Sequence, residues 1–254
     1  MPKSIAFVRR PGPSYNRAIS ANPKDQPIDL KRACLQHEHY IAALEKTGVE
    51  IVSLPAIHGY PDAPFVEDTT VVFDHLALAC PNKEKSRRGE GASIHKEIKK
   101  YRTIKTLPPS VTLDGGDVLN TDEKIFVGIS ERTNMEAVDA LAKFTKKPVF
   151  PVEVLFGLHL KTSVTYLGNN ILVLDPSSLD THPLREFKWV EISRPNRYAA
   201  NCLAIGDTVL MSKGSNKIAD KIHKEGFKTL SLDISEFEKA DGGLTCLSIM
   251  LKQI

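Results

Sequence analysis

One order of elements recurs along the chain, and it restricts the folds that this sequence can adopt. In each unit, two short apolar runs predict a β-hairpin, a helical stretch follows, and a further extended run ends the unit. The first unit has its hairpin at 69–80, a helix at 92–101 and an extended run at 103–107, and later hairpins begin near residues 116, 162 and 202. Repeats of about fifty residues are typical of solenoids and propellers.

The fifth unit needs both ends of the chain. Residues 244–251 and 5–8 each have the pattern of an apolar strand, and a helical pattern near 30–46 is followed by an extended run at 49–54. Placing the last strand beside the first completes the same order and closes a ring with few exposed strand edges. We therefore expect one α/β domain over residues 1–254, a five-bladed ββαβ propeller whose fifth blade is shared between the N- and C-termini. An open α/β sheet of βαβ pieces is the alternative that the pattern leaves.

Two helices inside these units carry further expectations. Thr133 is a suitable N-cap for a helix whose apolar residues recur at helical spacing as far as Phe144. A weaker helical pattern spans about 176–187. Both helices are expected between the second and third strands of their blades.

The composition limits the class of protein. The net charge of +3 is too small to indicate nucleic-acid binding, and the basic residues between 83 and 100 are interrupted by glutamates, as on a solvated surface. No apolar run has the length of a signal-peptide core or a bilayer span. We therefore expect a cytoplasmic protein that binds neither nucleic acid nor a membrane.

The four cysteines are Cys34, Cys80, Cys202 and Cys246. None forms a Cys-x-x-Cys pair, so neither a zinc knuckle nor a thioredoxin-type motif is indicated. Most free cysteines are small buried hydrophobic residues, so a functional role for one of them has to come from its surroundings.

Two acidic stretches precede predicted hairpins. In the first, Asp62, Glu67 and Asp68 either solubilise the end of a strand or converge on a cationic ligand such as a guanidinium. In the second, Asp114 and Asp117 flank a Gly-Gly pair, which indicates either a simple turn or a backbone that closely approaches another group. Neither stretch has a phosphate-binding glycine motif.

His159 and Cys246 form a third candidate site. A thiolate nucleophile needs a base or an imidazolium nearby. Each of the two residues begins a hairpin strand in its own unit, and Asp68 and Asp114 occupy the matching places in two others. In a ring, these strand ends meet at one central mouth, so residues from four blades can form one site.

At these residues the sequence resembles the dimethylarginine dimethylaminohydrolase family of the guanidino-group-modifying (pentein) superfamily. The matching segments follow the family's order and span nearly the whole chain. They are Phe-Val-Glu-Asp at 65–68, Leu-Asp-Gly-Gly-Asp-Val-Leu at 113–119, Val-Gly-Ile-Ser-Glu-Arg-Thr-Asn at 127–134, Gly-Leu-His-Leu-Lys at 157–161, Ala-Ala-Asn-Cys at 199–202 and Asp-Gly-Gly-Leu-Thr-Cys at 241–246. The resemblance separately implies a five-bladed propeller with the substrate on its axis.

The resemblance also implies catalytic roles. Cys246 is expected to attack the guanidinium carbon, and His159 to protonate the leaving amine and then activate water. Asp114 is expected to orient that site, although Asp68 is also well placed to do so. The implied reaction converts Nω-methylated arginine to citrulline and di- or monomethylamine through a thiouronium on Cys246. It needs no cofactor, although zinc could bind Cys246 and His159 and inhibit them.

Substrate-binding roles follow from the same resemblance. Asp68, Glu67 and Asp62 are expected to clamp the guanidinium, and Arg87 and Arg132 to bind the carboxylate at the amino-acid end.

The backbone carbonyl of Ala240 is expected to receive the α-amino group. Tyr15 aligns where the family usually has a leucine in a mobile lid.

Lys161 narrows the expected substrate. Related arginine and agmatine deiminases have an aspartate two residues after the histidine, where this chain has Lys161. A lysine taken to be unpaired cannot hold an unsubstituted guanidinium, which favours a methylated arginine. An arginine or agmatine deiminase, a citrulline ureidase and a non-catalytic propeller binding protein are the alternatives. The expected partner is a small guanidino amino acid, bound by a monomer or a homodimer.

Overall fold

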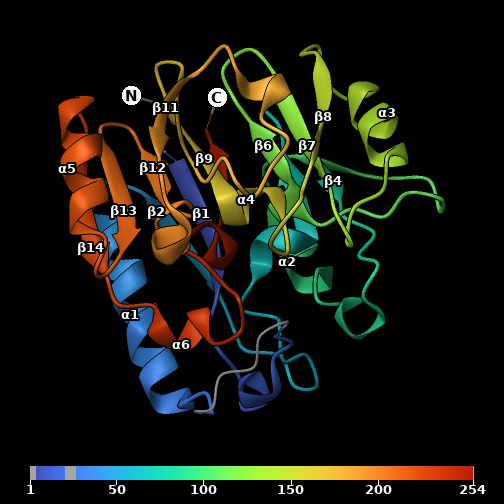
Figure 1. Cartoon of the computed structure of the whole chain (residues 1–254). Coiled ribbons are helices and arrows are strands. Elements are labelled where there is room, and N and C mark those ends of the chain that lie inside the picture. The colour runs from blue at the N-terminus through green and yellow to red at the C-terminus, as the bar shows by residue number, and fades with distance from the viewer. Residues whose placement is uncertain (1–3, 21–26, 254) are drawn as a thin grey trace.

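Five three-stranded sheets form the framework of the computed structural model, which describes residues 4–20 and 27–253 (Figure 1). In the four sheets that are continuous in sequence, the first strand is antiparallel to the second, and the second is parallel to the third. These sheets consist of β3 (Thr70–Val72), β4 (Leu76–Ala79) and β5 (Thr103–Thr106); β6 (Val118–Asn120), β7 (Ile125–Ile129) and β8 (Val149–Glu153); β9 (Val164–Gly168), β10 (Ile171–Leu174) and β11 (Lys188–Glu191); and β12 (Leu203–Ile205), β13 (Thr208–Ser212) and β14 (Lys228–Leu232).

The fifth sheet joins the two ends of the chain. Its middle strand, β1 (Ser4–Arg9), pairs antiparallel with β15 (Ile249–Lys252), and Ile5 lies opposite Leu251. On its other side, β1 pairs in parallel with β2 (Glu50–Leu54). The sheet thus has the strand order of the other four, which confirms the five-bladed propeller.

Four helices of about two turns or more connect second and third strands. They are α1 (Leu30–Lys46), α2 (Ala92–Ile98), α3 (Glu136–Ala142) and α5 (Asn216–Lys224). The longest, α1, begins where the side chain of Asp29 accepts hydrogen bonds from the backbone N–H groups of Lys31 and Arg32. Its inner face buries Ala33, Tyr40 and Leu44. No described helix is long and apolar enough to cross a bilayer.

Short helical turns complete the described structure. They are α4 (Leu160–Ser163), α6 (Ser235–Glu238), η1 (Tyr15–Arg17), η2 (Val66–Thr69), η3 (Lys85–Arg87), η4 (Gly115–Asp117), η5 (His182–Leu184), η6 (Arg194–Ala199) and η7 (Thr245–Leu247). Among them, η2, η4, α4 and η7 directly precede the first strands of four blades, and contacts link η7 to η2, η2 to η4, and η4 to α4. They therefore bring residues from four blades together near the centre of the ring.

Two helix expectations are wrong in detail. Thr133 does not cap α3, which begins at Glu136; instead its buried hydroxyl donates to Asp117 Oδ2 over 2.6 Å. The segment 176–187 contains only the turn η5 and no α-helix. The Asp175 side chain accepts the Ser177 N–H and forms a local turn there, and Pro183 lacks the N–H that a helix needs.

Apolar side chains fill the spaces between neighbouring blades. Ile5 and Phe7 of the shared blade, for example, pack with Ala77 of the next blade and with Ile94 and Ile98 of α2. Burying a large aliphatic or aromatic side chain contributes about 1.5–3 kcal/mol.

Candidate active site

His159 and Asp114 are joined by a hydrogen bond at the centre of the ring. His159 directly precedes α4, and its Nε2 lies 3.0 Å from Asp114 Oδ2. Asp114 is fully buried, and its other oxygen accepts a 2.6 Å hydrogen bond from Asn82 Nδ2. The expected orienting acid therefore contacts the expected general acid. Asn82 was not foreseen, because only the folded chain brings it to Asp114.

Asp68 approaches the other side of the imidazole. Its Oδ1 accepts the Gly116 N–H over 3.0 Å and lies 3.9 Å from His159 Nδ1. Its Oδ2 accepts from Arg87 Nη1 over 2.6 Å. Burial would raise the pKa of Asp68, but the positive charges of His159 and Arg87 lower it to about 2. Asp68 is therefore a carboxylate at neutral pH.

The charge on His159 follows from these neighbours. Burial would lower its pKa, but the negative charges of Asp68, Asp117 and Asp114 raise it to about 9. The imidazole therefore carries a proton on both nitrogens at neutral pH. With Nε2–H donated to Asp114, the Nδ1–H is the proton available for chemistry.

Gly115 and Gly116 allow the turn to pass close to these groups. A Cβ on Gly116 would lie 2.7 Å from His159 Nδ1 and 2.8 Å from Asp68 Oδ1. A Cβ on Gly115 would lie 2.1 Å from the backbone oxygen of Glu67. The interpretation of the Gly-Gly pair as a close backbone approach is confirmed.

Asp117, which follows the Gly-Gly pair, supports the turn. Its Oδ1 accepts the Leu160 N–H, and its Oδ2 accepts from the hydroxyls of Ser130 and Thr133. These bonds join η4 to the start of α4 and so fix the backbone that carries His159.

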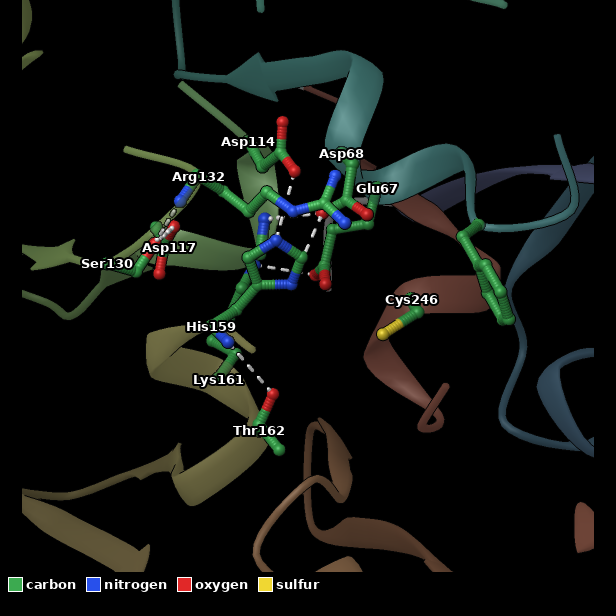
Figure 2. Close-up of polar contacts among 12 residues, drawn as sticks. Glu67, Asp68, Asp114, Asp117, Ser130, Arg132, His159, Lys161, Thr162 and Cys246 are labelled. Carbon is green, nitrogen blue, oxygen red and sulfur yellow. Dashed lines mark hydrogen bonds and ion pairs between the residues drawn. The ribbon is translucent and has the colours of Figure 1, made fainter. Parts of the chain in front are cut away.

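Cys246 lies across the site from His159. It is half-buried on η7, and Figure 2 shows its Sγ directed toward the imidazole side of the site. The sulfur accepts a 3.5 Å hydrogen bond from the Gly243 N–H. Burial, reinforced by the negative charges of Glu67 and Asp68, raises the pKa of the thiol to about 12. Cys246 is therefore a neutral thiol at neutral pH.

A cavity of about 130 Å³ connects most of the expected residues. The expected residues that line it are Cys246, His159, Asp68, Asp62, Arg87, Arg132 and Ala240. It is also lined by Ile19, Ser20, Phe65, Glu131, Leu158, Asp241 and Gly242, to which the motifs assigned no role. Asp114 does not line the cavity, because it contacts Nε2 of the imidazole on the side away from the cavity.

Asp62 presents an acceptor at this cavity. Its Oδ1 accepts the Ile19 N–H over 3.0 Å, whereas Oδ2 is buried without a hydrogen-bond partner among the described residues. Burial raises the pKa of Asp62, and the charges of Arg87 and Arg132 oppose that effect. A buried oxygen of this kind suits a cationic group of a ligand.

Glu67 and Lys161 form an ion pair outside this cavity. Lys161 Nζ lies 2.6 Å from Glu67 Oε1, and Thr245 Oγ1 donates to Glu67 Oε2 over 2.8 Å. The two side chains line a separate cavity of about 260 Å³. The expectation of an unpaired Lys161 is therefore wrong, and the Glu67 carboxylate is already engaged by other side chains.

Tyr15 does not line the catalytic cavity. Its ring is fully buried and packs against Phe65 and Phe237, and its hydroxyl donates to the backbone oxygen of Glu236. Ile19, four residues later, lines the cavity instead. The expectation that Tyr15 contacts the substrate is therefore wrong for this cavity. Residues 21–26 lie outside the described chain.

The described chain has one potential metal-binding group. Asp68, Asp114 and His159 can each present one ligand atom, with all three atoms within 4.8 Å of one another. A ligating imidazole must be neutral, but these carboxylates favour a charged His159. The group does not include Cys246, and zinc binding at Cys246 and His159 stays a prediction.

Comparison with known proteins agrees with this geometry. A family model described as N,N dimethylarginine dimethylhydrolase, eukaryotic, matches residues 2–251. The chain belongs to this family.

Two curated bacterial dimethylarginine dimethylaminohydrolases are similar over nearly their whole length. The chain is 29% identical to the Pseudomonas aeruginosa protein over 248 residues, which cover 96% of this chain and 97% of that one. It is 32% identical to the Streptomyces coelicolor protein over 259 residues, which cover 100% and 99%.

Solved structures extend this agreement to the fold. The P. aeruginosa family member, as a cysteine-to-serine mutant in complex with citrulline, has a TM-score of 0.92 at 28% identity, covering 99% of this chain and 100% of that one. The N-terminal domain of ArgZ, a cyanobacterial arginine dihydrolase, has a TM-score of 0.91 at 18% identity, covering 99% and 98%. At that identity the likeness to ArgZ shows the fold alone.

Proposed function

We propose that this chain hydrolyses Nω-methylated arginine to citrulline and methylamine or dimethylamine. The observation that carries the proposal is that Cys246, His159 and Asp68 line one cavity, while Asp114 is hydrogen-bonded to His159. Family membership and the citrulline bound to the P. aeruginosa relative support the same reaction. We expect a cytoplasmic enzyme whose partner is this small substrate.

Substrate charge activates the nucleophile. With a pKa raised to about 12, the Cys246 thiol keeps its proton in the free enzyme. A guanidinium bound beside Asp68 adds a positive charge near the sulfur, which lowers the thiol pKa. The thiol proton then passes to water, so the thiolate forms mainly when substrate is present.

The first half-reaction transfers the amidine carbon to sulfur. The thiolate forms a C–S bond to the guanidinium carbon and gives a tetrahedral adduct. The Nδ1–H of His159 protonates the methylated nitrogen, and its C–N bond breaks as the neutral amine leaves. The Asp114 hydrogen bond keeps the imidazole in the orientation that this transfer needs.

The second half-reaction returns the enzyme to its resting state. Neutral Nδ1 accepts a proton from water, and the water oxygen forms a C–O bond to the thiouronium carbon. The proton of the new C–OH group passes to the sulfur as the C–S bond breaks, which releases citrulline, regenerates the Cys246 thiol and leaves His159 protonated.

The amino-acid end of the substrate has matching groups in the cavity. Arg87 and Arg132, the arginines expected at the α-carboxylate, both line the cavity, and the carbonyl of Ala240 would accept from the α-amino group. Asp62 was expected in the guanidinium clamp, and its unpartnered Oδ2 would accept from a cationic group of the substrate. Figure 2 shows the Arg132 side chain extending over His159 and toward Asp68.

Lys161 favours a methylated substrate. Its ammonium pairs with Glu67 outside the catalytic cavity, so this position brings no second carboxylate to that cavity for an unsubstituted guanidinium. Methyl groups need space and not hydrogen-bond acceptors, whereas arginine would leave N–H donors unpaired.

A product assay tests the proposal. Purified protein is incubated separately with asymmetric dimethylarginine, arginine, agmatine and citrulline, and citrulline, amine and ammonia are quantified. Citrulline with stoichiometric dimethylamine is the expected result, and Cys246→Ser should form none while unfolding at the wild-type temperature. Absence of wild-type turnover of dimethylarginine, or faster ammonia release from arginine, would refute the assignment.

A further inference from the structure

Asn201 lies near the axis in the one blade whose first strand follows no residue of the proposed reaction. Each of the other four first strands follows such a residue: Asp68 before β3, Asp114 before β6, His159 before β9 and Cys246 before β15. Asn201 precedes β12 in the same way, at the end of the Ala-Ala-Asn segment. It is 4% exposed and does not line the catalytic cavity. The ring thus has a buried amide where the other blades have catalytic groups.

The Asn201 amide joins the two turns that carry the reacting groups. Its Nδ2 donates over 2.9 Å to the backbone oxygen of Lys161 on α4, which begins directly after His159. Its Oδ1 accepts over 2.9 Å from the backbone N–H of Thr245 on η7, which also carries Cys246. The amide therefore connects the turn of the general acid to the turn of the nucleophile through their backbones.

Two further contacts close a ring of hydrogen bonds that includes four blades. Asn201 Nδ2 lies 3.2 Å from Thr245 Oγ1, which donates its own proton to Glu67 Oε2 over 2.8 Å. Glu67 Oε1 pairs with Lys161 Nζ, and the backbone oxygen of Lys161 accepts from Asn201. Buried polar groups that are joined in a closed network hold one another in a single arrangement.

The amide fits this place in both size and polarity. A Cβ on Gly243 would lie 2.3 Å from Asn201 Cγ, so the glycine turn before Cys246 packs directly on the amide. An ionised aspartate of the same shape has no hydrogen to donate, and it would place an oxygen against the Lys161 oxygen. The amide Nδ2 also lies 4.0 Å from Cys246 Sγ, which is too long for a strong hydrogen bond. Asn201 therefore acts on the sulfur through the backbone.

We propose that Asn201 is a positioning residue that holds the Cys246 sulfur within reach of the substrate's guanidinium carbon and of His159. The inference rests on the proposed function of the site. The hydrogen bonds of Asn201 go to α4 and η7, and not to Asp68 or to the arginines that line the cavity. Loss of the amide should therefore impair bond formation more than substrate binding.

Steady-state kinetics test this division. Asn201→Asp keeps the shape of the side chain and removes both N–H donors. We expect kcat for dimethylarginine to fall on the order of 100-fold, because a displacement of about 1 Å between reacting groups has an effect of that size, while KM changes by less than about threefold. Asn196→Asp is the matched control, because that exposed amide on η6 donates to Ser193 Oγ at the surface and should keep wild-type kinetics. A folded Asn201→Asp protein with wild-type kcat would overturn the proposal.

A second pair of variants separates positioning from folding. Thermal unfolding shows which variants are folded. If the buried carboxylate prevents folding, Asn201→Ala removes the amide without adding a charge and should change kcat and KM in the same way. Thr245→Val breaks the same ring of hydrogen bonds at the hydroxyl. The fall in kcat of the double variant should therefore be smaller than the product of the two single falls, and falls that multiply in full would contradict a shared network.

A labelling experiment distinguishes this inference from the proposed function. Chloroacetamidine is a cation that resembles a guanidinium and alkylates thiols, so saturation kinetics at Cys246 separate its binding from its reaction with the sulfur. Asn201→Ala should lower the alkylation rate constant roughly tenfold or more and leave the dissociation constant within about threefold of wild type. An unchanged rate constant would overturn the positioning role whatever the product assay shows. The expected labelling result without wild-type turnover of dimethylarginine would refute the proposed function alone.

Discussion

The ammonium of Lys161 lies 2.6 Å from Glu67 Oε1, in an ion pair drawn from two different blades. Glu67 follows Val66 on η2, and Lys161 belongs to α4. Burial raises the pKa of Glu67, and the charge of Lys161 opposes this effect. The pair therefore places the positive charge of Lys161 against a buried carboxyl group, and the negative charge of Glu67 contributes to the raised pKa of the Cys246 thiol.

Removing Lys161 should destabilise the ring. Lys161→Met leaves the Glu67 carboxylate buried without a cation, which costs about 3 kcal/mol for a pair of this kind. Urea unfolding followed by tryptophan fluorescence measures the change. The double variant Lys161→Met, Glu67→Gln should recover most of the loss, and a midpoint of Lys161→Met equal to wild type would contradict the expectation.

The Asp114–His159 hydrogen bond should act on turnover more than on binding. Asp114→Asn replaces the charged acceptor of Nε2 with a neutral one, so the imidazolium is less stable and less well oriented. We expect kcat to fall on the order of 100- to 10,000-fold, the range of general acid catalysis, while KM changes little. Steady-state citrulline formation measures both, with Asp139→Asn on the exposed face of α3 as control. A change confined to KM would argue against the orienting role.

His159 should make stability depend on pH. Its pKa is raised in the folded protein from an ordinary value of 6.5 to about 9. The folded state thus binds this proton more tightly than the unfolded state, and the contribution to stability is full below about pH 6.5 and lost as the pH rises through about 9. Urea midpoints of wild type and His159→Gln should therefore differ by more at about pH 6 than at about pH 10. An equal difference at both pH values is the contrary outcome.

Cys246 should react slowly with neutral electrophiles in the absence of substrate. With its thiol pKa raised to about 12, little thiolate is present at neutral pH, and alkylation by iodoacetamide should accelerate about tenfold per pH unit up to at least about pH 10. Mass spectrometry of the peptide containing Cys246 measures the rate, with Cys202, whose pKa is likewise raised to about 12, as a buried comparison. A plateau reached below about pH 8 would mean that the resting enzyme already holds a thiolate.

Gly116→Ala should disable the site with little change in fold. The added Cβ would lie 2.7 Å from His159 Nδ1 and 2.8 Å from Asp68 Oδ1, so one of these catalytic groups must move. A fall in kcat/KM on the order of 100-fold is expected. Gly206→Ala is the comparison, because a Cβ there has no neighbour within 4 Å and only its positive φ of 59° is strained. That variant should lose stability but keep its kcat.

The repeat in the sequence was sufficient to predict the ring, because each blade has its own hairpin and its own apolar pattern. The shared blade followed from the need to pair the apolar strands near residues 5 and 250. The helix expected at 176–187 was wrong because Asp175 and Pro183 form local turns that a weak apolar pattern does not reveal. Local hydrogen bonds of this kind compete with helices and are hard to weigh from sequence.

Within the site, sequence located the residues better than it located their contacts. Cys246, His159 and Asp68 line one cavity as expected, because each begins a blade at the axis. The pairing of Lys161 with Glu67 and of Arg87 with Glu90 was not foreseen. The sequence left Lys161 unpaired and assigned Arg87 to the ligand. Each of these residues has an acidic partner that only the folded chain brings into contact with it.

The pairing of β15 with β1 also bears on when the protein can first become active during synthesis. Cys246 lies just before β15, the strand that completes the fifth sheet. A growing chain therefore carries β1 and β2 through almost the whole of translation before β15, the antiparallel partner of β1, exists. Contacts between segments so far apart in sequence form late and slowly. The nascent protein therefore exposes one edge of β1 until β15 is synthesised. The pairing of β15 with β1 protects this edge from aggregation and also brings Cys246 into the catalytic site.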